Sequence, residues 1–345
     1  MRAIRLTRWQ HEPELVDIEV PEPGPGEVLI EVQGAGLCHS DLHLAEWPEG
    51  VVPFELPFTL GHETAGRVAA LGPGAGGVGL GAPVLVFSRW GCGRCPACLQ
   101  GMDNACRCPV SELPGFGAGV GRDGGLAEYM LVPSTRYLVE IDGLDPVLAA
   151  PLSDAALTPY HAIRRAAHHL RPGTTAVVIG VGGLGHMAVQ LLRALSPVRV
   201  VAVDLRPQAR ELALAAGADA ALPAEGLEAA ELRAHAGVAG AGLVLDFVAS
   251  DATLALACGA VAVGGEIAYL GRGGGSLAVS PATLPYECSV SLPSWGTLPE
   301  LVEVVALARA GLITVEAERL ALDEALEGYR RMRRGDIRGR MVVAS

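Results

Sequence analysis

Four cysteines lie close together in one short segment of this 345-residue chain. They follow the pattern C-x-x-C-x-x-C-x(7)-C and are Cys92, Cys95, Cys98 and Cys106. Four thiolates can surround Zn²⁺ as a tetrahedron with Zn–S distances of about 2.3 Å, and such a site has no open position. The spacing therefore predicts a structural zinc site, with an iron–sulfur cluster as the alternative. The other cysteines outside the motifs, Cys108, Cys258 and Cys288, are expected to be free thiols.

A glycine-rich motif, G-x-G-x-x-G, directly follows an apolar strand and opens a helical segment. Its residues include Gly180, Gly182, Gly183, Leu184 and Gly185. Glycine permits a tight turn, a close approach of the backbone to a pyrophosphate, and packing of the helix on the strand. The helix N-terminus adds free N–H groups and a partial positive charge. The motif predicts a dinucleotide site, and a ligand-free turn is the alternative.

An acidic residue follows the next expected strand, 198–203. Asp204 stands at about the 20-residue spacing at which a carboxylate binds the ribose hydroxyls of a dinucleotide. Such a carboxylate repels the 2′-phosphate of NADP, so NAD is the expected coenzyme. Arg206 is open to two interpretations, because an arginine there can bind that phosphate or can be a solvated loop charge.

The composition excludes several kinds of chemistry. All 26 basic residues are arginine, so no amine side chain is available for a Schiff base or a phosphate-loop NTPase. The formal net charge of -12 argues against a nucleic-acid partner. Residues 1–14 do not resemble a secretory signal, and no unbroken apolar run is long enough for a membrane span. A cytoplasmic protein without a membrane partner is expected.

The elements that must position these residues fall into two regions. Residues 1–150 carry short runs rich in Val and Leu, separated by Gly and Pro turns, which predicts a small antiparallel β-barrel. From about Thr174, apolar strands alternate with helical segments, which predicts βαβ units on a parallel sheet. Two helices and a closing strand, 340–344, are expected near the end.

Two more patterns follow apolar runs: Cys38-His39-Ser40-Asp41 and Gly61-His62-Glu63. Alone, they would be explained by a buried cysteine and a core histidine. With the four-cysteine loop and the glycine motif, in this order along the whole chain, they resemble the zinc-containing medium-chain alcohol dehydrogenase family. The similarity is greatest to bacterial NAD-dependent secondary-alcohol and aryl-alcohol dehydrogenases.

The resemblance implies an α/β fold with two domains. A GroES-like β-barrel catalytic domain is expected in residues 1–155, and a Rossmann coenzyme domain with a doubly wound parallel sheet in residues 156–290. Residues 291–345 are expected to return to the catalytic domain. The family also implies a homo-oligomer, either a dimer or a tetramer.

The resemblance further implies a second, catalytic zinc ion, so that each chain holds two. Cys38, His62 and Asp154 match its three ligands, and nothing local marks Asp154. Glu63 matches a carboxylate behind the metal, and Asp41 matches a carboxylate that orients the ligand histidine. Ser40 matches the hydroxyl that receives the substrate proton. His43 matches either a proton relay or a residue of the pocket wall.

The coenzyme and substrate contacts also come from the resemblance. His39, Thr158 and Arg340 match positions that contact the coenzyme, and Arg340 matches an arginine at its pyrophosphate. Phe54 and Trp295 match walls of the substrate pocket, with a core role as the alternative for each. The expected active site lies in a cleft between the domains.

These parts predict a zinc-dependent alcohol dehydrogenase that transfers hydride reversibly between NAD and a hydrophobic alcohol, secondary or aryl, or its ketone or aldehyde. Zinc is needed because a Lewis acid lowers the pKa of a bound hydroxyl. A polyol or amino-alcohol dehydrogenase of the same family is the main alternative. A zinc-free quinone reductase and a regulatory NAD sensor are weaker alternatives. The physiological substrate, the stereopreference and the favoured direction are left open by the sequence.

Overall fold

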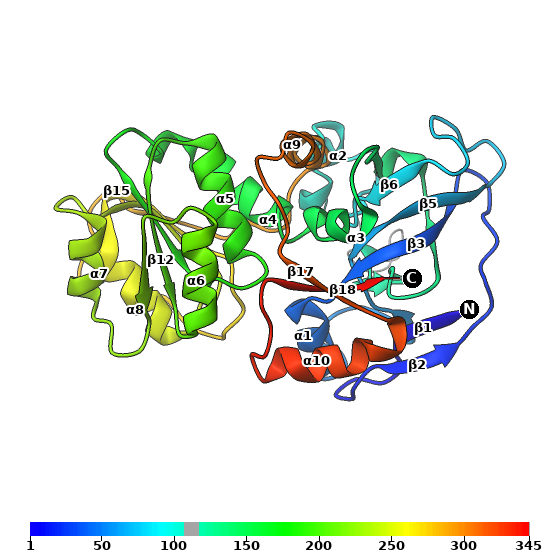
Figure 1. Cartoon of the computed structure of the whole chain (residues 1–345), viewed down its shortest axis with the longest axis horizontal. Coiled ribbons are helices and arrows are strands. Elements are labelled where there is room, and N and C mark those ends of the chain that lie inside the picture. The colour runs from blue at the N-terminus through cyan, green and yellow to red at the C-terminus, as the bar shows by residue number, and fades with distance from the viewer. Residues whose placement is uncertain (107–116, 345) are drawn as a thin grey trace. The chain divides into compact units, whose positions relative to one another are not determined.

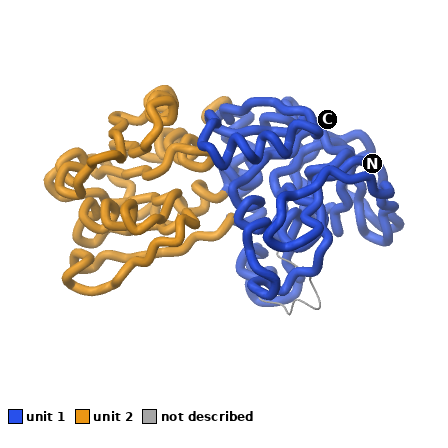
Figure 2. The backbone as a smooth tube through the Cα atoms, turned by 90° about the horizontal axis from the view of Figure 1, so that it is seen from below, with its two compact units in different colours: residues 1–157, 296–310, 314–345 blue, residues 158–295, 311–313 orange. Residues whose placement is uncertain are grey.

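The computed structural model describes residues 1–106 and 117–344, and its backbone divides into two compact units (Figure 2). Unit 1 comprises residues 1–157, 296–310 and 314–345. Unit 2 comprises residues 158–295 and 311–313. The chain therefore leaves unit 1 to form unit 2 and then returns. Cys108 lies outside the described residues, whereas Cys258 and Cys288 are free thiols.

The main sheet of unit 1 has seven strands, and β3 (Val28–Gly36) is central to it. β3 pairs antiparallel with β5 (Glu63–Leu71), β9 (Tyr129–Val132) and β18 (Arg340–Ala344). Valine, leucine and isoleucine fill the first half of β3, because their side chains pack well on a pleated, buried surface. Its second half is a glutamine followed by three small residues, and the last of them, Gly36, leaves room for the side chain of Glu63 on β5. The remaining strands are β6 (Pro83–Val86), β10 (Leu138–Glu140) and β17 (Ala317–Leu320).

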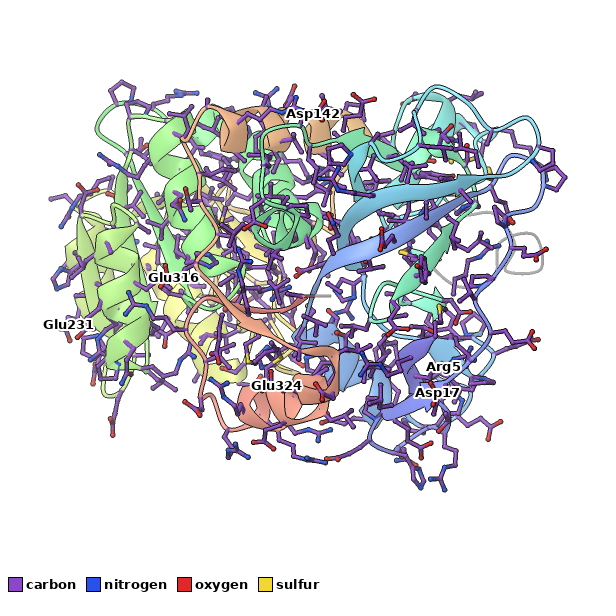
Figure 3. The ribbon with its side chains drawn as sticks, turned by 45° about the vertical axis from the view of Figure 1, so that its right-hand side comes forward. Arg5, Asp17, Asp142, Glu231, Glu316 and Glu324 are labelled. Atoms are coloured by element: carbon purple, nitrogen blue, oxygen red, sulfur yellow. The ribbon has the colours of Figure 1, made fainter. Side chains whose placement is uncertain are left out.

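Smaller elements complete unit 1. Strands β1 (Arg2–Leu6), β2 (Glu14–Asp17) and β4 (Phe58–Thr59) form a three-stranded sheet, in which Figure 3 labels Arg5 and Asp17. Two short strands, β7 (Gly117–Ala118) and β8 (Gly121–Arg122), pair with each other. The helices are α1 (His39–Glu46), α2 (Pro96–Leu99), α3 (Pro146–Ala149), α9 (Leu298–Arg309) and α10 (Ala325–Arg333).

Unit 2 is a parallel sheet of six strands in the order β13-β12-β11-β14-β15-β16. This order is 3-2-1-4-5-6 in chain sequence, the arrangement of a doubly wound dinucleotide-binding sheet. All five residues of β11 are buried, as expected for a parallel strand covered on both faces. The strands are β11 (Thr175–Ile179), β12 (Arg199–Asp204), β13 (Ala220–Pro223), β14 (Ala241–Asp246), β15 (Val261–Tyr269) and β16 (Ser289–Ser291).

Helices flank this parallel sheet (Figure 1). Helices α5 to α8 connect the strands from β11 to β15 in turn, which gives the βαβ units that the alternating sequence pattern predicts, whereas the described connection from β15 to β16 contains no helix. α4 leads from unit 1 into unit 2. The helices are α4 (Leu157–Arg165), α5 (Gly185–Leu195), α6 (Pro207–Ala215), α7 (Ala229–Ala236) and α8 (Asp251–Ala260).

Among residues 1–106 and 117–344, no helix combines the length and the apolar character that crossing a bilayer requires. The mixed α/β architecture agrees with the fold class expected from the sequence.

Candidate active site

A buried cluster in unit 1 joins Cys38, His62, Glu63 and Asp154, whose potential ligand atoms all lie within 4.8 Å of one another. Cys38 follows β3, and Glu63 is the first residue of β5. Because Gly36 pairs with Glu63 in the register of these two strands, the ends that carry the cysteine and the histidine meet. Asp154 follows the 3-10 helix Ala150–Ser153, which packs near both strands.

A backbone feature makes room for Glu63. A Cβ atom built on Gly36 would collide with the Glu63 carboxylate. Because Gly36 has no side chain, the Glu63 side chain on β5 can pack directly against the backbone of β3. On the other side of His62, Ser88 Oγ donates a 2.5 Å hydrogen bond to its carbonyl oxygen and fixes its backbone.

The donor set of the cluster fits a zinc ion. Asp154 Oδ2 lies 3.6 Å from Cys38 Sγ and 3.6 Å from His62 Nε2. Two ligands at about 2.0–2.3 Å from one tetrahedral ion are about 3.3–3.7 Å apart, so these separations suit a shared metal. A thiolate, an imidazole and a carboxylate are all zinc ligands, and three protein ligands leave one position open for chemistry.

Asp41 holds the histidine of this cluster in place. Its Oδ1 lies 3.3 Å from His62 Nδ1, which leaves Nε2 facing Asp154. Its Oδ2 accepts hydrogen bonds from the Cys38 backbone N–H at 3.1 Å and from the Tyr329 hydroxyl at 2.7 Å. All three partners are buried. Carboxylate partners of this kind fix the tautomer and orientation of a metal-binding imidazole.

The charges around His62 favour a cation at this point. Burial opposes protonation of the imidazole, but the nearby charges of Cys38 and Asp41 raise its pKa well above the usual value. The same anionic groups that attract a proton attract a divalent metal ion. The cluster is therefore electrostatically suited to hold one.

Arg340 brings a positive charge to the opposite side of the cluster. Its Nε donates a 3.0 Å hydrogen bond to Glu63 Oε2, and its Nη2 contacts Glu63 Oε1. Nη2 also lies 3.5 Å from Asp154 Oδ2. Burial raises the pKa of Glu63 to about 7 in spite of Arg340, which lowers it. The pair with Glu63 was not expected from the sequence, and the contact between Arg340 and a coenzyme pyrophosphate stays a prediction.

Helix α1 carries the other residues expected at the reaction centre. Ser40 Oγ lies 3.6 Å from Cys38 Sγ. His43, three residues later and therefore on the same helix face, is partly buried. His39 is exposed. α1 thus carries the predicted proton acceptor and the predicted relay residue on adjacent turns.

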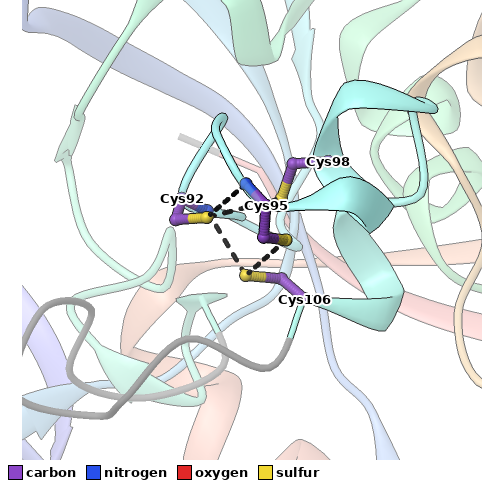
Figure 4. A group of neighbouring side chains, drawn as sticks. All are labelled: Cys92, Cys95, Cys98 and Cys106. Atoms are coloured by element: carbon purple, nitrogen blue, oxygen red, sulfur yellow. Dashed lines mark hydrogen bonds between the residues drawn. The ribbon is translucent and has the colours of Figure 1, made fainter.

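The four-cysteine loop is a second cluster in unit 1 (Figure 4). Cys92 Sγ lies 3.9 Å from Cys98 Sγ, and Cys95 Sγ lies 4.0 Å from Cys106 Sγ. The edge of a Zn–S tetrahedron is about 3.8 Å for bonds of 2.3 Å, so the four sulfur atoms fit one zinc ion. A Cβ on Gly91 would lie 2.5 Å from Cys98 Sγ, which explains the glycine.

The glycine motif lies at the carboxyl end of β11 in unit 2. Gly180 has a φ of +87°, a left-handed conformation that favours glycine. A Cβ on Gly185 would collide with the Gly180 carbonyl oxygen, whereas Gly182 faces open space. Gly180 and Gly185 thus have the roles expected for the turn and for helix packing, and the approach of a phosphate to Gly182 stays a prediction. Gly183 and Leu184 lie between them at the start of α5.

Asp204 ends β12 next to this turn. Its Oδ2 accepts a 2.7 Å hydrogen bond from the Val181 N–H, and its Oδ1 accepts one of 2.9 Å from the Arg206 N–H. The Arg206 side chain also contacts Oδ1, at 3.3 Å from Nε. The carboxylate is thus held at the glycine motif, and its contact with a coenzyme ribose stays a prediction.

The remaining predicted residues occupy different surroundings. Thr158 is buried in unit 2, and Trp295 is partly buried there with a φ of 56°. Phe54 is buried in unit 1 and packs edge-on to Phe58, with ring centroids 6.4 Å apart. Their roles at coenzyme and substrate stay predictions.

Sequence reasoning did not find Tyr329. The one available signal was its place on the apolar face of α10, together with Ala325, Gly328 and Met332. A tyrosine on such a face needs a partner for its hydroxyl when it is buried. Local spacing could not show that the partner is Asp41.

Comparisons with known proteins agree with this geometry. Residues 24–143 match the family model of the alcohol dehydrogenase GroES-like domain, and residues 183–308 match that of the zinc-binding dehydrogenases. The chain is 34% identical to an NAD-dependent alcohol dehydrogenase of Sulfurisphaera tokodaii over 99% of both chains. It is 32% identical to a D-arabinose 1-dehydrogenase (NADP(+)) of Saccharolobus solfataricus, over 99% of this chain and 97% of that one.

A solved structure supports the same assignment. The structure of acetophenone reductase from Geotrichum candidum in complex with NAD superposes with a TM-score of 0.86. It is 30% identical, and the match covers 100% of this chain and 97% of the other. On the fold, the two cysteine-containing clusters and these similarities, the chain belongs to the zinc-containing medium-chain alcohol dehydrogenase family and is an oxidoreductase with NAD and zinc as cofactors.

Proposed function

We propose that this protein interconverts a hydrophobic alcohol, secondary or aryl, with its ketone or aldehyde, using NAD. The observation that carries the proposal is the convergence of Cys38, His62 and Asp154, with Ser40 beside Cys38. These three side chains are the proposed zinc ligands, and Cys92, Cys95, Cys98 and Cys106 are the proposed ligands of a structural zinc ion. When bound at the first site, zinc supplies a Lewis acid that favours ionisation of a substrate hydroxyl.

Residues of the chain transfer the substrate's hydroxyl proton and balance the charge of the buried Glu63 carboxylate. Ser40 Oγ accepts the hydroxyl proton of the alcohol while it donates its own hydroxyl proton to the His43 imidazole on the next turn of α1, and His43 releases a proton to solvent. In the reverse direction the same groups return the proton to the carbonyl oxygen. Asp41 and Tyr329 keep His62 oriented, and Arg340 balances the charge of Glu63.

The proposed coenzyme site lies in unit 2. The glycine motif at the start of α5 offers backbone N–H groups to the pyrophosphate, and Asp204 accepts hydrogen bonds from the adenine-ribose hydroxyls. Because Asp204 is anionic and already engages Arg206, the site favours NAD over NADP. His39, Thr158 and Arg340 are proposed to contact the coenzyme, and Phe54 and Trp295 the substrate.

A polyol substrate is the second candidate, because one relative is a D-arabinose dehydrogenase. Initial rates of NADH and NADPH formation with matched aryl, aliphatic and polyol alcohols distinguish the two. We expect the highest kcat/KM with NAD and a hydrophobic alcohol such as 1-phenylethanol. A preference for polyols overturns the substrate class, and a preference for NADP overturns the role of Asp204.

We propose a homo-oligomer in the cytoplasm, with catalytic residues in 1–155 and 291–345 and coenzyme binding in 156–290. Light scattering during size-exclusion chromatography tests the oligomer: a monomer at micromolar concentration contradicts it. Cell fractionation tests the location.

A further inference from the structure

A third group of metal-binding side chains lies in unit 2, away from the residues used above. His168 and His169 end the 3-10 helix Ala167–His169, just before β11, and Glu266 lies on β15. One potential ligand atom from each lies within 4.8 Å of the others. The two histidines are adjacent in sequence, and the carboxylate is almost 100 positions away, so no local spacing marks this group.

The group lies away from the carboxyl edge of the parallel sheet. Glu266 aligns with Leu243 near the start of β14, whereas the glycine motif follows the last residue of β11. In the same register Tyr269 aligns with Asp246 at the carboxyl end of β14, three residues beyond Glu266. At about 3.3 Å per residue, that is roughly 10 Å along the strand. The group is therefore separate from the proposed dinucleotide site.

The distances within the group suit two ligands of one ion better than a direct ion pair. His169 Nε2 lies 3.6 Å from Glu266 Oε2, which is longer than a hydrogen bond between these atoms. Nε2 is buried and has no hydrogen-bond partner among the described residues. The ring centroids of His168 and His169 are 3.9 Å apart, so the imidazole of His168 is close enough to be a further ligand of the same ion. A buried nitrogen without a partner is costly, and a cation between the two atoms would satisfy both.

Neighbouring hydrogen bonds fix the backbone of the two histidines and the side chain of Glu266. Thr174 Oγ1 donates a 3.0 Å hydrogen bond to the His169 carbonyl oxygen, and Arg171 Nε donates one of 2.9 Å to that of His168. Ser291 Oγ donates a 2.5 Å hydrogen bond to Glu266 Oε1, which leaves Oε2 for the histidine side. Hydrogen bonds of this kind to a ligand carboxylate are a regular feature of metal sites.

We propose that His168, His169 and Glu266 form a third divalent-metal site, which takes zinc or a similar borderline transition metal from solution. Two imidazoles and one carboxylate are a zinc ligand set, and imidazole also suits copper and nickel. Magnesium and calcium, which prefer oxygen ligands, are excluded by the same chemistry. Glu266 is only 6% exposed, whereas His168 is exposed and gives the ion access.

Binding at this site ties the turn before β11 to β15, across the intervening strand β14. The ion therefore stabilises unit 2 rather than taking part in the reaction. Because it binds the folded state only, its effect on the melting temperature grows with the logarithm of the free metal concentration.

The test uses the full chain with two tightly bound zinc ions, verified by atomic emission spectroscopy. Zn²⁺ is then titrated against a chromophoric chelator at pH 7.5, and the melting temperature is measured with and without free Zn²⁺. The variants are His168→Gln and Glu266→Gln, the second of which keeps the shape of the side chain. The matched control is His11→Gln, because His11 is an exposed histidine in unit 1.

We expect a third equivalent of zinc and a zinc-dependent rise in melting temperature for the parent protein and for His11→Gln. Each of the other two variants should weaken the third site at least tenfold and lose the rise, while it keeps two zinc ions and the same far-UV circular dichroism. Mg²⁺ should shift no melting temperature. A parent protein that binds two zinc ions only, or a third equivalent that survives in both variants, overturns the proposal. So does a third equivalent that is lost in His11→Gln.

Discussion

Tyr329 donates a 2.7 Å hydrogen bond to Asp41, and the two residues are 288 positions apart in the sequence. Through Asp41, this hydroxyl is linked to both His62 and the backbone of Cys38. A helix late in the chain therefore steadies two proposed zinc ligands that lie near its beginning. The bond is buried, so water cannot replace it.

Replacing Tyr329 by Phe should weaken this support without removing a zinc ligand. Partners of ligand histidines typically contribute 10–100-fold to metal affinity or activity, and Tyr329 acts one step further out. We expect kcat/KM to fall about tenfold and zinc at this site to be lost faster to a chelator. The control is Tyr269→Phe, which removes a hydroxyl that donates to the Gly275 carbonyl oxygen in unit 2. Equal zinc loss in both variants would contradict the role.

Replacing Asp154 by Ala should remove zinc from the catalytic cluster and leave the four-cysteine loop loaded. We expect one zinc ion per chain and a loss of about 10³-fold in kcat/KM, since Lewis-acid stabilisation amounts to several kcal/mol. Atomic emission and initial-rate kinetics measure the two effects. Retention of two zinc ions with full activity would exclude Asp154 as a ligand.

Replacing Cys95 by Ser should remove zinc from the four-cysteine loop and leave zinc in the catalytic cluster. The loop loses its metal and its local folding energy, which is on the order of 10 kcal/mol for a structural zinc site, while the catalytic cluster is unchanged. We expect a lower melting temperature and faster proteolysis in the region of residues 92–106. Cys288→Ser is the control, because Cys288 is a partly buried free thiol outside both clusters. Equal effects of the two substitutions would argue against a metal in the loop.

Replacing Asp204 by Asn should weaken discrimination between coenzymes. A hydrogen bond to a charged group contributes about 1.5–3 kcal/mol, so the ratio of kcat/KM for NAD to that for NADP should fall at least tenfold. Asp219→Asn is a matched control, because Asp219 likewise accepts a 2.7 Å hydrogen bond from a backbone N–H, that of Val200, and contacts an arginine, Arg193. An unchanged ratio in Asp204→Asn would rule out the ribose contact.

Replacing Arg340 by Met should leave the Glu63 carboxylate buried without its partner. Breaking a buried pair in this way costs about 3–5 kcal/mol of unfolding free energy. The double variant Glu63→Gln with Arg340→Met should recover much of that loss, because no uncompensated charge remains. Denaturant titrations of the zinc-loaded proteins give the free energies, and additive effects of the two changes would contradict coupling.

The features that the sequence predicted best are local. The four cysteines and the glycine motif each fit within one turn-rich segment, where spacing alone limits the geometry. Long apolar strands such as β11 and β12 were also predicted correctly, because burial on both faces leaves a continuous apolar run. In strand β3, the large apolar residues all lie in 28–32. Its second half, 33–36, is a glutamine and three small residues, and its extended form depends on pairing with β5 and β18.

Features that depend on contacts between distant segments could not be predicted in the same way. Asp154 is 116 positions from Cys38, and only the family resemblance indicated it. The pairs of Arg340 with Glu63 and of Tyr329 with Asp41 arise because β18 and α10 return to the first sheet. The short strands β13 and β16 hold a single β-branched residue between them, Val290, so their extended conformation depends on pairing with the neighbouring strands.

The return of β18 has a consequence for biosynthesis. Because residues 158–295 separate its segments, unit 1 cannot close its sheet until the ribosome has translated past residue 340. Unit 2, almost contiguous in sequence, can assemble while translation continues, since domains fold as their residues emerge. During that interval the carboxylate of Glu63 has no guanidinium partner, and the edge of β3 that later pairs with β18 is unpaired. An unpaired strand edge can pair with another chain, so we expect the nascent protein to be prone to aggregation at this edge until β18 has been translated.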